Sequence, residues 1–105
     1  MKVIKAKLGG FEYRVIFRHD SDDDFGKTCL AEKTIWINDR YSKQVQRETL
    51  LHELLHVSLE DCPLVEFPID KKGDMEEALV RFISPRLFQF LQDNPKLKQF
   101  IWGGK

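Results

Sequence analysis

The amino-acid sequence predicts an α+β domain in which a small, mostly antiparallel N-terminal sheet packs on two helices. Three observations predict this fold class. Short alternating apolar stretches fill the first forty residues, a stretch without Gly or Pro follows at 44–61, and a second long helical stretch begins near residue 75. The 105 residues suffice for one hydrophobic core, so we expect a single domain over residues 1–105.

Four short stretches are predicted to be strands. Residues 2–7 and 11–17 are rich in β-branched and aromatic side chains and flank a Gly-Gly turn, which predicts a hairpin. Residues 27–31 form a short third strand, and residues 33–38 form the clearest strand because apolar residues alternate there. We expect the strand at 33–38 to lie at a sheet edge, beside the helix that follows it.

An acidic stretch at residues 18–26 separates the second and third strands and carries four aspartates. Counting from Asp20, the sixth residue is Phe25 and the twelfth is Ala31, where a calcium-binding EF-hand loop needs Gly and Glu. A solvated loop is therefore predicted. His19 lies in this loop and is predicted to be a surface histidine.

Capping and breaking residues predict the helix boundaries. Ser42 is a plausible cap for the helix at 44–61, and Pro63 ends that helix. An irregular loop follows at 64–73. Asp74 is expected to cap a second helix at 75–92, which Asn94-Pro95 ends, and residues 96–102 form a last helical turn or two.

The first predicted helix contains His52-Glu53-Leu54-Leu55-His56, a match to the HExxH pattern. Residues four apart lie on one helix face, so both imidazoles can reach one metal ion. Glu53 stands about 100° around the helix from His52, where it can act as a general base without ligating the metal. Because the helix is apolar nearly all round, we expect it to be buried. Two core histidines bonded to backbone carbonyls are the alternative interpretation.

A catalytic zinc ion normally has three protein ligands and one open position. The start of the second helix offers Glu76 and Glu77, and periodicity places each of them on an apolar helix face. Cys62, six residues after His56, is a further candidate, either as an extra ligand or as the fourth ligand of a closed structural site. From the residues alone these alternatives stay open.

The segments TLLHELLHVSLE and EEALVRFISPRLFQFLQDNP, joined by a short loop in a small chain, resemble compact phage and prophage proteins with an HExxH motif. Such proteins are similar to the minimal gluzincin peptidases and, more distantly, to the ImmA/IrrE-like metallopeptidases. The resemblance implies a zincin-like fold with zinc on His52 and His56 and with Glu53 as catalytic base. It also implies Glu77 as the third ligand, with Arg81 standing where the gluzincin signature has an acidic residue.

The expected function is that of a zinc metalloendopeptidase, active or latent, which hydrolyses a protein or peptide substrate by means of a zinc-activated water. The alternative is a non-catalytic zinc-binding phage protein that holds a host or phage partner. Tyr13 and Tyr41 are unassigned candidates for stabilising the oxyanion of the reaction.

Composition limits the partners. A hydrophobic content of 42%, with 32% charged residues and zero formal net charge, is typical of a globular chain without general attraction to nucleic acid or acidic membranes. Neither an apolar membrane span nor a signal peptide is evident, and Cys29 and Cys62 are expected to be free thiols in the cytoplasm. We expect a monomer.

Overall fold

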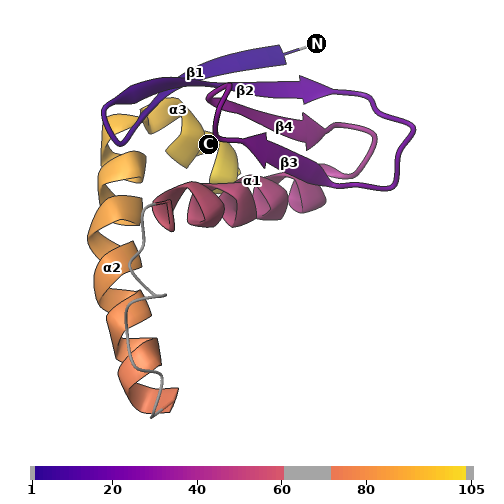
Figure 1. The fold of residues 1–105 in the computed structure, drawn as a ribbon. Coiled ribbons are helices and arrows are strands. Elements are labelled where there is room, and N and C mark those ends of the chain that lie inside the picture. The colour runs from indigo at the N-terminus through magenta and orange to yellow at the C-terminus, as the bar shows by residue number, and fades with distance from the viewer. Residues whose placement is uncertain (1, 61–71, 104–105) are drawn as a thin grey trace.

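The computed structural model describes residues 2–60 and 72–103, and it shows the α+β fold that the sequence predicts (Figure 1). Four strands form one sheet: β1 (Lys2–Leu8), β2 (Phe11–Arg18), β3 (Gly26–Cys29) and β4 (Thr34–Asn38). Three helices follow: α1 (Lys43–Ser58), α2 (Lys72–Asp93) and α3 (Pro95–Ile101). The predicted boundaries of the strands and the predicted start of α1 are therefore correct to within a few residues.

The strand order in the sheet is β1-β2-β4-β3. β1 and β2 form the predicted antiparallel hairpin, and β3 pairs antiparallel with β4. β2 and β4 run parallel, so the sheet is mixed, with two antiparallel pairs and one parallel pair. Gly9 and Gly10 both have positive φ, 61° and 85°, which explains why glycines occupy this hairpin turn.

The expected position of β4 at a sheet edge is wrong. β4 lies between β2 and β3, and β3 forms the edge on that side. The burial of the two strands explains the order: four of the five β4 residues are buried, whereas β3 contains no fully buried residue. A half-exposed strand with Gly26 and Lys27 suits an edge better than one whose side chains are almost all buried.

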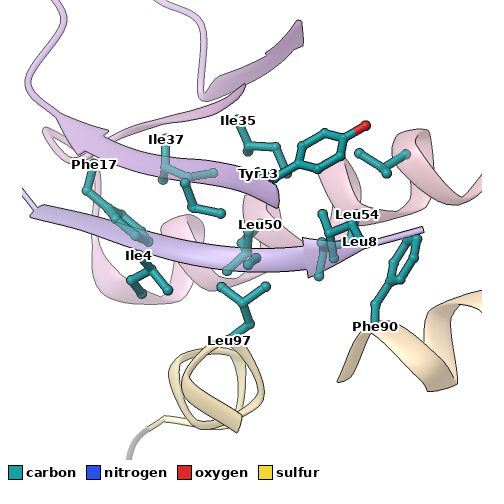
Figure 2. Packing of buried hydrophobic residues seen from close by; sticks show 13 residues of the cluster. Ile4, Leu8, Tyr13, Phe17, Ile35, Ile37, Leu50, Leu54, Phe90 and Leu97 are labelled. Carbon is teal, nitrogen blue, oxygen red and sulfur yellow. The ribbon is translucent and has the colours of Figure 1, made fainter. Parts of the chain in front are cut away.

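The hydrophobic core lies between one face of the sheet and the helices (Figure 2). Alternate residues of β1 and β2 point into it, as a half-buried strand requires. Leu50 and Leu54 of α1, Phe90 of α2 and Leu97 of α3 complete the core from the helix side. This packing fixes which face of α1 is turned towards solvent.

Two helix boundaries follow the predicted signals and one does not. The Ser42 hydroxyl accepts a hydrogen bond from Val45 N (3.3 Å), which confirms the cap of α1. Asn94 separates α2 from α3 as predicted, and its side chain bonds both Lys7 N and Lys7 O (2.8 Å each) on strand β1. α2 begins at Lys72, so Asp74 lies within its first turn and does not stand before the helix as a cap.

The α2 helix runs beside the sheet and α1, and its N-terminal half extends beyond them (Figure 1). The predicted end of the first helix at Pro63, the residue Cys62 and most of the predicted loop at 64–73 lie outside the described residues.

Candidate metal centre

The two faces of α1 have opposite environments. Leu50, Leu54 and Val57 are buried in the core, as their position opposite His52 on the helix predicts. His52 and His56 are exposed, so the expectation that the histidines are buried is wrong. The sheet and the other helices cover only one side of α1, and both imidazoles lie on the uncovered side, within reach of a metal ion and of solvent.

The two imidazoles face each other across one helical turn. Their Nε2 atoms lie 3.1 Å apart, and the ring planes meet at 75°. Two nitrogens bound tetrahedrally to zinc at 2.0–2.1 Å would lie roughly 3.3–3.4 Å apart. The side chains are therefore arranged almost as a shared metal ion would require. Without a metal, the same distance allows one ring to donate its Nε2 proton to the other.

Glu53 is the buried member of the motif, with only 5% of its surface exposed. Its carboxylate Oε2 accepts a hydrogen bond from the Thr28 hydroxyl of β3 (3.2 Å). Among the ion pairs of the described residues, none involves Glu53. A buried carboxylate with one neutral donor and no cation is costly, unless a charge or a polar ligand arrives at its free oxygen.

His52, Glu53 and His56 form one group whose potential ligand atoms all lie within 4.8 Å of one another. Among the side chains that the structure describes, in residues 2–60 and 76–103, this is the sole group of three with that proximity. The structure thus brings together the three motif residues that the sequence singled out, and it defines a possible metal site on the exposed face of α1.

The structure does not bring Glu77 into this group. Its side chain is exposed, and its Oε1 accepts a hydrogen bond from Arg81 Nε (2.8 Å). Glu76 is also exposed. Both faces of α2 contribute to the core: Phe90 on the Glu76 face is buried, and on the Glu77 face Leu91 packs against the core while Phe88 is 68% exposed.

Neither tyrosine is free to face the metal group. Tyr13 is fully buried, and its hydroxyl lies 3.4 Å from Glu60 Oε2. The Tyr41 hydroxyl donates to the Asp23 carbonyl (3.0 Å) in the acidic loop. His19 is exposed, as predicted for a surface histidine, and does not belong to the metal-binding group.

A cluster of three side chains holds the C-terminal end of α1 against the sheet, one turn beyond His56. Glu60 pairs with Lys33 (3.7 Å) of the β3–β4 turn and accepts from Tyr13 of β2. Burial, and then the charge and hydrogen bond of Glu60, raise the pKa of the Tyr13 hydroxyl to about 12. The neutral phenol is therefore favoured in the folded state.

We expect this raised pKa to make the stability fall at alkaline pH. Below pH 10 both the folded and the unfolded chain keep the Tyr13 proton, so the stabilisation is complete. Between pH 10 and about 12 the unfolded chain releases the proton first, and the free energy of unfolding falls by roughly 1–3 kcal/mol. Urea unfolding from pH 9 to 12 measures the decline, which Tyr13→Phe should reduce. Parallel curves for the two proteins would contradict the assignment.

A pocket of about 280 Å³ opens beside the histidine pair, between the N-terminal half of α1 and the start of β3. His52 and Glu53 form one end, and the other lining residues are Phe25, Gly26, Val45, Glu48 and Thr49. Gly26 allows β3 to approach the helix closely. A Cβ at this position would lie 2.6 Å from the Trp36 carbonyl oxygen and 2.7 Å from Thr49 Cγ2.

Sequence reasoning missed Thr28, Gly26 and Glu48 as parts of this site. Thr28 and Gly26 belong to the strand that proved to be the edge, and nothing in their local pattern signals contact with α1. Glu48 carried a usable signal, because it stands four residues before His52 and therefore lies one turn away on the same helix face.

Fold and site together define an α+β protein with a possible metal centre on its first helix. Comparison of the chain with protein-family models, with curated proteins and with solved structures finds no significant match. In the described part of the chain, no helix has the length and apolar character that crossing a membrane requires. What the protein does must therefore be inferred from the chemistry of the site.

Proposed function

We propose that this chain is a zinc-dependent peptidase in which His52 and His56 hold the metal and Glu53 is the general base. The observation that carries the proposal is the pairing of two imidazoles, 3.1 Å apart and open to solvent, with a buried carboxylate that forms an ion pair with no cation of the described residues. Two core histidines bonded to carbonyls would instead be buried. The donor set of two imidazoles suits zinc better than calcium or magnesium, which prefer oxygen ligands.

When bound, zinc supplies a Lewis acid that polarises a carbonyl group and acidifies water. The residues of the chain supply the rest of the chemistry. Thr28 fixes one oxygen of Glu53, which leaves the other oxygen to accept a proton from the attacking water. The same carboxyl group can then deliver that proton to the leaving amine. Burial of Glu53 limits its rotamers and so keeps this oxygen in place.

The edge strand β3 offers a place for an extended substrate. Asn38 N donates to Phe25 O (2.8 Å), which makes these two opposite residues a hydrogen-bonded pair. By the alternation of an antiparallel ladder, the N–H and C=O groups of Gly26 and Thr28 then point away from β4. A peptide that adds to this edge would lie over α1 beside His52 and Glu53. We propose a protein or peptide substrate and a monomeric, cytoplasmic enzyme.

Glu77 remains the proposed third ligand, and in that role it would exchange Arg81 for the metal. The exchange costs little, because an exposed ion pair contributes at most about 1 kcal/mol. We expect Glu77→Ala to weaken zinc binding more than Glu76→Ala in a competitive chelator titration. The reverse order would transfer the role to Glu76. If neither variant changes the zinc affinity, neither glutamate is the third ligand, and Cys62 or water takes that role.

The test of the proposed function is cleavage of a random peptide library by zinc-loaded protein, read by mass spectrometry. We expect cleavage that chelation stops and added zinc restores. A chain that binds one zinc yet cleaves nothing would instead favour the alternative function, a zinc-binding protein that holds a partner.

A further inference from the structure

One charged residue that lines the pocket beside His52 has no role in the proposed reaction. Glu48 lines the pocket one helical turn before His52, and its side chain is exposed. In the described part of the chain, none of the ion pairs includes Glu48. Its carboxylate is therefore available to a group that enters the pocket.

The other walls suit a long side chain with a cationic end. Val45 and Phe25 are apolar, and the Phe25 ring is held edge-on against Tyr41 with ring centroids 4.6 Å apart. The methylene stem of a lysine or arginine can lie along such a surface while its charged head reaches a carboxylate. A guanidinium group also gains from contact with an aromatic ring. The volume of about 280 Å³ is suited to one or two side chains.

The acidic loop adds a negative potential at the same end of the molecule. Three exposed aspartates of this loop, Asp22, Asp23 and Asp24, directly precede Phe25 in the chain. Asn38 Nδ2 binds three carbonyl groups of this loop, those of Asp20, Asp22 and Asp24, at 3.0–3.2 Å. These bonds, together with those from Arg40, use backbone oxygens, and in the described residues none of the ion pairs includes an aspartate of the loop.

Two cations belong to the region of the acidic loop: Arg40 donates to the Ser21 and Asp22 carbonyls, and Arg18 lies over the Trp36 ring. Other positive charges lie farther away. Lys2, Lys5 and Lys96 line a groove along β1 and α3, and β1 is the opposite edge of the sheet from β3. Lys27 belongs to β3, but its side chain alternates with those of Gly26 and Thr28 and so lies on the sheet face away from α1. Among the described residues that line the pocket, two are glutamates and none is a lysine or arginine, so the pocket itself favours a cationic side chain.

We propose that the site selects peptides with a lysine or arginine side chain close to the bond presented to His52 and Glu53, and that Glu48 determines this selectivity. The proposal rests on the proposed peptidase function for its substrate class. An extended peptide on the β3 edge would direct one side chain towards α1, into the pocket between Phe25 and Glu48. The bond between the cationic head and Glu48 would be charge-assisted and therefore stronger than a neutral one.

The test compares two peptides that differ only in arginine against citrulline, its uncharged isostere. We expect the zinc-loaded protein to favour arginine at least roughly tenfold in kcat/KM. Glu48→Gln should reduce the ratio to within about threefold, and Glu48→Lys should favour a glutamate peptide instead. Glu12→Gln is the matched control, because it also removes one negative charge. Glu12 belongs to β2, and β4 lies between β2 and β3, so this variant should keep the arginine preference.

Binding of the same two peptides to zinc-loaded Glu53→Gln protein, read by fluorescence anisotropy, separates the two proposals. Cleavage without a basic preference, or with a preference that Glu48→Gln leaves intact, would overturn the role of Glu48 and keep the peptidase. Binding that favours arginine and depends on Glu48, in a chain that cleaves nothing, would overturn the peptidase and keep the Glu48 site. If the protein shows neither cleavage nor selective binding, both proposals are overturned.

Discussion

His52→Ala should abolish stoichiometric zinc binding. The wild-type chain is expected to carry close to one zinc ion by elemental analysis, and the variant should bind it at least roughly a hundredfold more weakly, because a lost ligand costs more than a lost supporting hydrogen bond. At a free zinc concentration of one hundred times Kd, the wild-type protein should gain about 2.7 kcal/mol of stability. The variant should lose most of that gain.

His19→Ala is the matched control, since it removes an exposed histidine from the acidic loop and should leave zinc content unchanged. In the presence of chelator, His52→Ala and wild type should unfold at the same urea concentration, because His52 lies on the exposed face of α1 and contributes nothing to the core. Full zinc occupancy in His52→Ala would show that the imidazole pair is not the metal site.

Local patterns were enough to predict most of the fold. The Gly-Gly turn sets the β1–β2 hairpin, and the Ser42 cap begins α1 at its observed place. The HExxH spacing guarantees that His52 and His56 share a helix face, whatever surrounds the helix. These features depend on residues close in sequence, and geometry of the backbone alone fixes them.

The arrangement of the elements depends on contacts that no local pattern contains. β3 rather than β4 forms the edge because long-range burial decides strand order. The sequence therefore did not predict the hydrogen bond from Thr28 to Glu53, which joins residues 25 positions apart. The exposure of both histidines was missed for a similar reason. Apolar residues surround them on the helix, yet the sheet covers only the Leu50 and Leu54 side.

The third ligand shows the same limit. Both faces of α2 are apolar in sequence, so periodicity could not distinguish Glu76 from Glu77. In the structure Leu87, Phe90 and Leu91 pack on the core while Val80 and Phe88 face solvent, so both faces contribute contacts to the core. Only the tertiary structure carries this information, because each face satisfies the helical pattern equally well.

Glu53→Gln should abolish catalysis while leaving the metal site and the fold intact. The glutamine side chain has the same size, and its amide oxygen can still accept the hydrogen bond from Thr28. What it lacks is a basic oxygen, so we expect kcat to fall by roughly 10²–10⁴-fold. The variant should melt at or above the wild-type temperature, because the substitution removes a buried charge that pairs with no cation in the part of the chain that the structure describes.

Zinc stoichiometry, melting temperature and peptide cleavage, measured on the same preparation, distinguish the roles open to Glu53. Loss of cleavage with retained zinc assigns it as the general base. Loss of zinc would instead make it a ligand or the support of one, since the amide cannot replace a carboxylate charge near the metal. Normal cleavage would refute the general-base role.

Thr28→Val tests whether Thr28 positions Glu53. The variant keeps the carboxylate but removes the hydrogen bond that fixes its rotamer. We therefore expect kcat to fall less than in Glu53→Gln, with zinc retained.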